Sequence, residues 1–193
     1  VDARAAKPAL NWAGYTPPRP KFIGRRTFKN FDLAELANFI DWTPFFQTWS
    51  LFGQFPAILE DKVVGEQARA VYADGQAMLK RMIDGRWLTA NGAVAFYPAN
   101  TVNDDDIEIY TDETREKVLF TWRGLRQQGM KRDGVENKCL ADFIAPKNSG
   151  LVDYIGMFAV TAGLGIEKKE REFEQAGDDY SAILFKSLAD RLA

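Results

Sequence analysis

The chain has 193 residues, of which 46% are hydrophobic and 27% are charged, and its formal net charge is −2; these values are ordinary for a globular protein with one sizeable core. It contains no histidine and one cysteine, Cys139, which excludes Ser-His-Asp and Cys-His catalysis and histidine-based zinc or haem sites, so we expect binding rather than catalysis. The lone cysteine cannot form an internal disulfide, and no apolar run approaches the roughly 18 residues of a membrane helix, so we expect a cytoplasmic protein without a membrane partner.

The first 30 residues are basic and contain several prolines. They carry seven Lys or Arg residues against one acid, Asp2. The prolines of "GYTPPRP" (residues 14–20) favour an extended, polyproline-like conformation. We interpret residues 1–30 as a connector arm from a preceding domain, and residues 31–193 as the folded part. A nucleic-acid-binding arm is the alternative, but no aromatic-and-basic signature follows it, so we expect no nucleic-acid partner.

Three helices are expected next along the chain. Asp32 and Glu35 have the spacing of a capping box, at the start of an apolar helical face over residues 33–40. Thr43 and Pro44 are typical of the N-cap and first residue of a second helix, which continues to Leu51. A third helix follows Gly65 and stops at Gly85.

The middle of the chain has the period of strands. "GAVAFYPAN" (92–100) is a short apolar run, "DIEIY" (106–110) alternates, and "KVLFTW" (117–122) is rich in β-forming residues. The acidic loop 103–106 between the first two predicts an antiparallel meander. "DYIGMFAVTAG" (153–163) predicts a further buried strand, and a helical apolar face runs from Glu167 to the end. Without βαβ alternation, we expect an α+β single domain: an antiparallel β-meander with flanking helices and an extended N-terminal arm.

Asp41, in "IDWTPFFQTW" (40–49), is the main candidate site residue. It lies beside Trp42, Phe45 and Phe46, where a carboxylate is partly desolvated unless it is paired. Asp41 is not needed as a helix cap, because Thr43 can cap the next helix. One interpretation is an acceptor or counter-ion for a polar or cationic ligand in an aromatic-walled pocket. The other is a helix-junction Asp bonded to backbone amides or to an internal Arg, and spacing alone slightly favours it.

A second group of carboxylates comprises Asp104, Asp105, Asp106, Glu108, Asp112 and Glu113. Such a group can bind a divalent metal or supply an acid/base pair. It lacks the glycine and the ligand spacing of a calcium loop, so we expect no metal site and interpret it as a solvated hairpin turn with an outward strand face. An independent carboxylate enzyme that uses this loop is an alternative function. Cys139 is expected to pack as a small apolar residue.

The motif around Asp41 also resembles a known family. "DWTPFF" (41–46) is similar to the opening of the C-terminal reactivation domain of cobalamin-dependent methionine synthase, which binds S-adenosylmethionine. Eight more motifs resemble that domain in its own order: "YTPP" (15–18), "FPAIL" (55–59), "FYPAN" (96–100), "DDIEIYTDETR" (105–115), "LRQQ" (125–128), "CLADFIAPKNSG" (139–150), "DYIGMFAVTAG" (153–163) and "DDYSAILFKSLADRLA" (178–193). The resemblance covers nearly the whole chain from Tyr15 on.

This resemblance implies a function as part of methionine synthase, the methyltransferase that acts on 5-methyltetrahydrofolate and homocysteine. The domain is expected to bind S-adenosylmethionine and to present its methyl group to cob(II)alamin during reductive methylation. The implied partners are the cobalamin-binding domain, which holds the cobalamin, and flavodoxin or a flavoprotein reductase, which supplies the electron. Zinc is implied only in another domain of the full enzyme, and this piece alone is not expected to be catalytic.

The resemblance further implies that Asp41 contacts S-adenosylmethionine, whose ammonium and sulfonium groups suit a carboxylate. Pro44, Phe45 and Phe46 would fix the backbone and the wall rather than bond the ligand. The family's other main contacts, an Arg-x-x-x-Gly-Tyr-Pro-Ala-Cys-Pro segment and a later aromatic pair, have no counterpart up to Ala193. We therefore expect residues 31–193 to be a partial domain, truncated at its C-terminus. The alternative is an interaction module that docks a cobalamin-binding domain or flavodoxin without binding S-adenosylmethionine.

Overall fold

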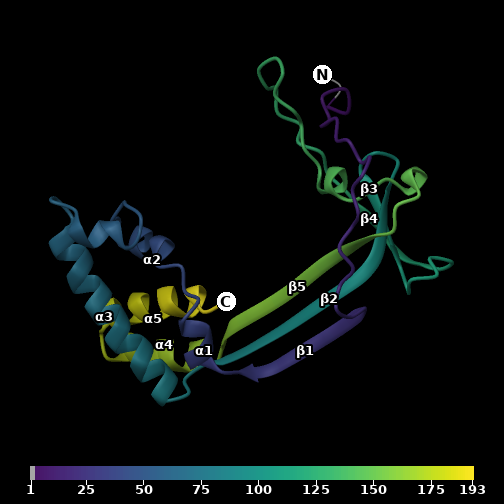
Figure 1. Ribbon diagram of the computed structural model, residues 1–193. Helices are drawn as coiled ribbons and strands as arrows, with labels where there is room; N and C mark the ends of the chain where they lie inside the picture. The colour runs from purple at the N-terminus through teal and green to yellow at the C-terminus, as the bar shows by residue number, and fades with distance from the viewer. Residues whose placement is uncertain (1–2) are drawn as a thin grey trace. The chain divides into compact units, whose positions relative to one another are not determined.

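The structure is a computed structural model that describes residues 3–193. The chain divides into two compact units. Unit 1 comprises the residues up to Arg26 together with Val94–Phe158, and unit 2 comprises Thr27–Ala93 together with Ala159–Ala193. Three strands have residues in both units (Figure 1): β1 (Gly24–Phe31), β2 (Thr89–Val102) and β5 (Asp153–Leu164).

The five strands form one sheet in the order β1-β2-β3-β4, and β5 pairs with β2. Strand β3 (Asp106–Tyr110) runs antiparallel to β2 and to β4 (Val118–Arg123), with Glu108 opposite Asn100 on one side and Thr121 on the other. The predicted antiparallel meander and the α+β class are thus confirmed. Strand β1 was not predicted, because its side chains are mostly exposed and give no apolar period.

Unit 1 has a small core built on the alternation of β3. Ile107 and Ile109 point to the same face of the strand and are almost fully buried. They pack with Ala99, Cys139 and Ala141. The cysteine is buried and free, as expected for a small apolar residue. Two short 3-10 helices, η2 (Leu140–Phe143) and η3 (Lys147–Ser149), follow it.

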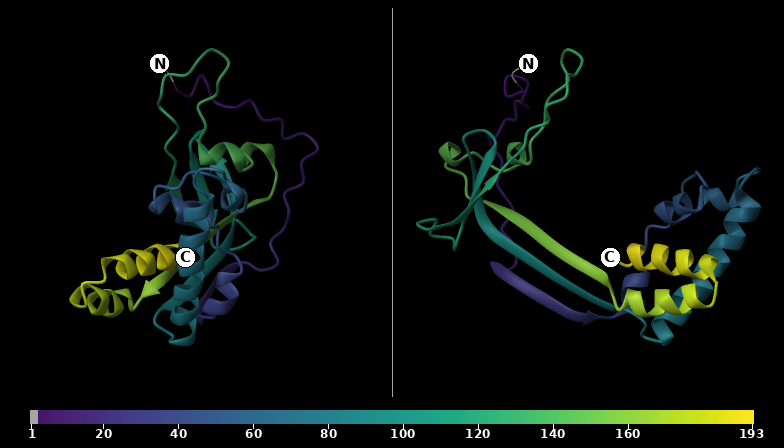
Figure 2. Two further views of the ribbon diagram at one scale, coloured as in Figure 1. Left: turned by 90° about the vertical axis from the view of Figure 1, so that its left-hand side faces the viewer. Right: turned by 180° about the vertical axis from the view of Figure 1, so that it is seen from behind.

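Unit 2 is mainly helical. Its elements are α1 (Leu33–Ala37), α2 (Thr43–Thr48), the 3-10 helix η1 (Ala57–Glu60), α3 (Gly65–Asp84), α4 (Ile166–Gln175) and α5 (Asp179–Arg191). Helix α5 packs against α2, α3 and α4 (Figure 2). The predicted third helix matches α3 at both ends. In this part of the chain, and throughout residues 3–193, no helix is long and apolar enough to cross a membrane.

Several predicted details are wrong. Asp32 does cap α1 by accepting a hydrogen bond from Ala34 N (2.8 Å), but the helix ends at Ala37. The face expected to be continuous from Glu167 belongs to two helices, because Gly177 adopts a left-handed φ of 69° between them. Strand β5 is mostly not buried, and Phe158 is 76% exposed. An apolar run does not specify which of its faces is covered.

Candidate functional site

Asp41 lies in the short link between α1 and α2. Its side chain is exposed, and Oδ1 accepts a hydrogen bond from Thr43 N at 3.0 Å. Partial desolvation was therefore the wrong expectation. The expectation that Thr43 caps α2 is also wrong. Thr43 is the first residue of α2, and its Oγ1 accepts a hydrogen bond from Phe55 N (3.2 Å) instead of capping the helix. Among the described residues, Asp41 Oδ2 has no hydrogen-bond partner and can accept one from a ligand.

The aromatic residues beside Asp41 form part of the core of unit 2. The ring of Trp42 meets the rings of Phe45 and Tyr72 edge-on, with centroids 5.2 and 4.9 Å apart, and Phe46 stacks on Phe55 at 6.2 Å. Trp42 is 7% exposed, and Phe45 and Phe46 are 0% exposed. These rings therefore fix the start of α2, and with it the backbone that carries Asp41, but they do not face an open pocket.

A polar cluster near the end of α2 was not anticipated from the sequence. The ring of Trp49 lies 5.0 Å from that of Tyr180, whose hydroxyl donates to Asp74 Oδ2 at 2.8 Å. Burial, with the hydrogen bond to Asp74, raises the pKa of Tyr180 to about 12. Trp49 Nε1 is buried without a partner in the part of the chain that the structure describes. No sequence pattern links these three residues, because they come from three separate helices or helix ends.

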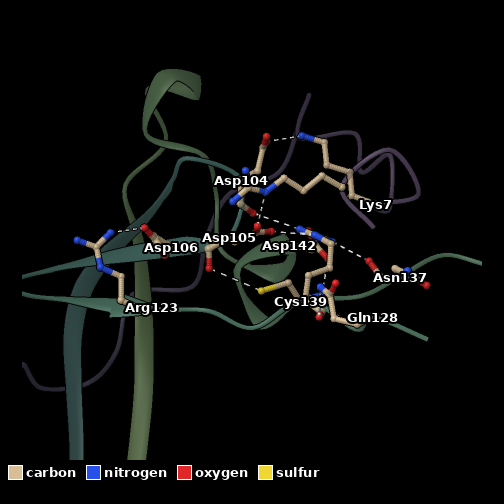
Figure 3. Close-up of polar contacts among 11 residues, drawn as sticks. Lys7, Asp104, Asp105, Asp106, Arg123, Gln128, Asn137, Cys139 and Asp142 are labelled. Carbon is tan, nitrogen blue, oxygen red and sulfur yellow. Dashed lines mark hydrogen bonds and ion pairs between the residues drawn. The ribbon is translucent and has the colours of Figure 1, made fainter. Parts of the chain in front are cut away.

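One acid of the carboxylate group in unit 1, Asp105, is bound by Arg126, and Figure 3 labels Asp105 and the neighbouring Asp142. The Arg126 side chain is only 1% exposed; its Nε donates to Asp105 Oδ1 at 2.8 Å, and its two terminal nitrogens donate to Asp142 at 2.6 and 2.8 Å. Asp142 also accepts from Cys139 N at 2.7 Å. Asp105 is buried, which corrects the prediction of a fully solvated turn. No pattern in the sequence indicates that Arg126 contacts Asp105.

The other acids of this group are also paired, or hydrogen-bonded locally. Their partners are Lys7 for Asp104, Arg123 for Asp106, Lys147 for Glu108, Arg19 for Glu113 and Thr114 for Asp112. Burial opposes ionisation of Asp105, but hydrogen bonds from Arg4 and Arg126 outweigh it and keep its pKa below the ordinary value. The hydrogen bonds from Arg19 and Tyr154 lower the pKa of Glu113 to about 2.

Asp105 and Glu113 consequently stay ionised, and each is paired with cations of the chain. A pair of carboxylates that act as general acid and general base needs pKa values that are pushed apart, and the two shifts given above are both downward. Within residues 3–193, no three Cys, Asp or Glu side chains lie so that together they could hold a metal ion. The arrangement favours a structural role for the acidic loop over an independent carboxylate enzyme.

Two comparisons with known proteins bear on this chain. The sequence profile of the family described as "Vitamin B12 dependent methionine synthase, activation domain" matches residues 32–193. A crystal structure of the MetH reactivation domain bound to AdoHcy is 49% identical in sequence and superposes with a TM-score of 0.88. The match covers 99% of this chain and 58% of that chain, so this chain spans somewhat more than half the length of that relative.

Proposed function

This chain belongs to the family of vitamin B12-dependent methionine synthase activation domains, and from that premise we propose that it is a reactivation module that binds S-adenosylmethionine and presents its methyl group to cob(II)alamin. The observation that carries the proposal is the ligand of the similar crystal structure, AdoHcy. S-adenosylhomocysteine is what remains of S-adenosylmethionine after the methyl group has left. At 49% identity over 99% of this chain, the same ligand class is the natural expectation here.

The proposal extends to the enzyme that contains such a module. That enzyme transfers a methyl group from 5-methyltetrahydrofolate to homocysteine in the cytoplasm, with cobalamin on a neighbouring domain and zinc on another. Flavodoxin or a flavoprotein reductase supplies the electron for reactivation. S-adenosylmethionine and cobalamin provide the methyl-transfer chemistry, and residues 31–193 contribute binding and orientation. Residues 1–30 are proposed to connect to the cobalamin-binding domain.

Asp41 is the residue that we assign to S-adenosylmethionine. Its Oδ1 is held by Thr43 N, and the buried ring of the next residue, Trp42, fixes the backbone on which it stands. Its exposed Oδ2 can then accept from the ammonium group or a ribose hydroxyl of the ligand. The negative charge also suits a ligand that bears an ammonium and a sulfonium.

The test is a calorimetric titration of S-adenosylmethionine into this chain and into Asp41→Asn. An Asn side chain can still accept from Thr43 N through its oxygen, but it lacks the charge that favours the ligand. We expect affinity to fall at least tenfold, about 1.4 kcal/mol, which is within the range of a hydrogen bond to a charged group. Asp32→Asn is the matched control, because Asp32 is likewise exposed and bonded to a backbone amide two residues on, Ala34 N.

Each other outcome has a definite meaning. Equal binding by the parent chain and Asp41→Asn would remove Asp41 from the ligand site. No binding by the parent chain, together with saturable binding to a cobalamin-binding domain or to flavodoxin, would replace this proposal with that of an interaction module. Weakening by Asp32→Asn as large as by Asp41→Asn would mean a general charge effect instead of a specific contact.

A further inference from the structure

The basic arm is fastened to unit 1 at two places. Near its start, Arg4 Nε donates to Asp105 Oδ2 at 2.6 Å, Lys7 pairs with Asp104, and Ala6 O accepts from Asn137 N at 2.8 Å. Near residue 20, Arg19 makes a two-pronged ion pair with Glu113, at 2.8 and 2.7 Å. Residues 3–19, called the strap below, are therefore held at both ends.

The strap forms one wall of a cavity in unit 1. The cavity has a volume of about 580 Å³, a size that suits a small molecule. Residues 7–10 and Trp12 of the strap line one side of the cavity. The other lining residues are 101–104, 141, 142, 144 and 146–148. Asp142, whose carboxylate accepts from Arg126, is one of the lining residues outside the strap.

We propose that the strap is an electrostatic lid, which covers one side of this cavity and uncovers it when its ion pairs are weakened. The cationic side chains that hold it, Arg4, Lys7 and Arg19, are all well exposed (62%, 44% and 69%). Ion pairs with an exposed partner are individually weak and are screened by salt. The large apolar side chains Leu10 and Tyr15 remain 46% and 43% exposed. The buried apolar residues of the strap, Ala3, Pro8 and Pro17, are small, so their burial holds it less strongly than buried large side chains would.

Opening would leave the rest of unit 1 intact. Asp105 would keep its hydrogen bond to Arg126 (2.8 Å), and Glu113 would keep the one from the Tyr154 hydroxyl (3.0 Å). Asp104 is half exposed and would be solvated. No buried charge would lose its last partner, which is the condition that makes breaking an ion pair expensive.

The strap also has a fixed end from which it can swing. Just beyond it, the ring of Phe22 packs edge-on against Phe96 of β2 with centroids 5.1 Å apart, and the guanidinium of Arg26 lies 3.9 Å above the same ring. These contacts involve none of the three strap ion pairs. Loss of the ion pairs would therefore release residues 3–19 while the chain stays anchored at Phe22.

Hydrogen exchange at the Asn137 amide reports directly on closure, because its acceptor, Ala6 O, belongs to the strap. The Thr101 amide, which donates to Ala145 O at 3.1 Å, reports on the body of unit 1. Raising the salt concentration from about 0.02 M to about 0.5 M should accelerate exchange at Asn137 severalfold and leave Thr101 unchanged. The double substitution Arg4→Gln with Lys7→Gln should accelerate exchange at Asn137 roughly tenfold at low salt and reduce the salt effect to the part that comes from Arg19.

Two further variants sharpen the result. Lys80→Gln removes an exposed ion pair with Asp84 in α3 and should leave Asn137 unchanged. Lys7→Asp combined with Asp104→Lys forms an ion pair of reversed polarity. This pair should restore the protection of the Asn137 amide that Lys7→Asp alone removes. Exchange at Asn137 that responds neither to salt nor to the double substitution would overturn the proposal. If the double substitution also exposes Thr101, the salt titration of the unaltered chain decides: parallel changes at both amides would overturn it, and a change at Asn137 alone would support it.

Discussion

Arg126 is a single residue on which much of unit 1 depends. Its guanidinium is buried and meets the carboxylates of Asp105 and Asp142 at 2.8 and 2.6 Å. Replacing it with an apolar side chain of similar length would leave two buried acids without this partner, so we expect Arg126→Met to lower the free energy of unfolding by about 3–5 kcal/mol. Urea denaturation of the parent chain and the variant measures the loss.

The matched control for that substitution is Arg123→Met. Arg123 pairs with Asp106 nearby, but its side chain is 74% exposed, so its removal should change the free energy of unfolding by less than about 1 kcal/mol. If both substitutions cost the same, the burial of Arg126 would not be the cause of its importance.

At this scale the sequence predicted the wrong environments for two acids. Asp41 was expected to be desolvated by neighbouring aromatics and is exposed, because the rings of Trp42, Phe45 and Phe46 turn into the core. Asp105 was expected to be solvated and is buried. Its burial depends on Arg126, 21 residues further on, and local spacing contains no information about such a distant partner. The resemblance of "DWTPFF" to a known family, and not the spacing, is what indicated Asp41.

Among the elements, the exit from β4 depends on a glycine. A Cβ atom at Gly124 would lie 1.9 Å from the backbone oxygen of Asp105 and 2.8 Å from Cys139 Sγ. The backbone oxygen cannot move aside without disturbing the turn between β2 and β3, so we expect Gly124→Ala to destabilise unit 1 by about 2–3 kcal/mol. Gly129→Ala, in the same loop, meets no atom within 4 Å and should be nearly neutral. Urea denaturation of both variants tests the difference, and a neutral Gly124→Ala would contradict it.

Elements with a clear period were predictable, and exposed ones were not. The 20 residues of α3 have apolar side chains at helical spacing between two glycines, and β3 alternates strictly, so both were found with nearly correct bounds. Strand β1 exposes almost all its side chains and therefore left no apolar pattern. The break between α4 and α5 depends on one backbone conformation at Gly177, which a continuous apolar face conceals.

Over the whole chain, the uneven charge distribution has an internal explanation. Three of the seven cations in the first 30 residues, Arg4, Lys7 and Arg19, pair with acids of unit 1. The basic arm and the acidic loop, which looked like separate features in the sequence, are therefore complementary parts of one unit. This pairing gives those arm charges a role that needs no nucleic acid.

The two units also have separate apolar cores, which predicts separate responses to core substitutions. Ile109 is fully buried in the core of unit 1 and Leu188 in that of unit 2. Truncating either to Ala removes buried contacts and leaves a cavity, at a cost of about 2–5 kcal/mol. Because neither core cluster contains residues of the other, we expect Leu188→Ala to accelerate hydrogen exchange in α3 and α5 and to spare β3, with the reverse pattern for Ile109→Ala. Acceleration throughout residues 3–193 by either variant would show instead that the units unfold as one.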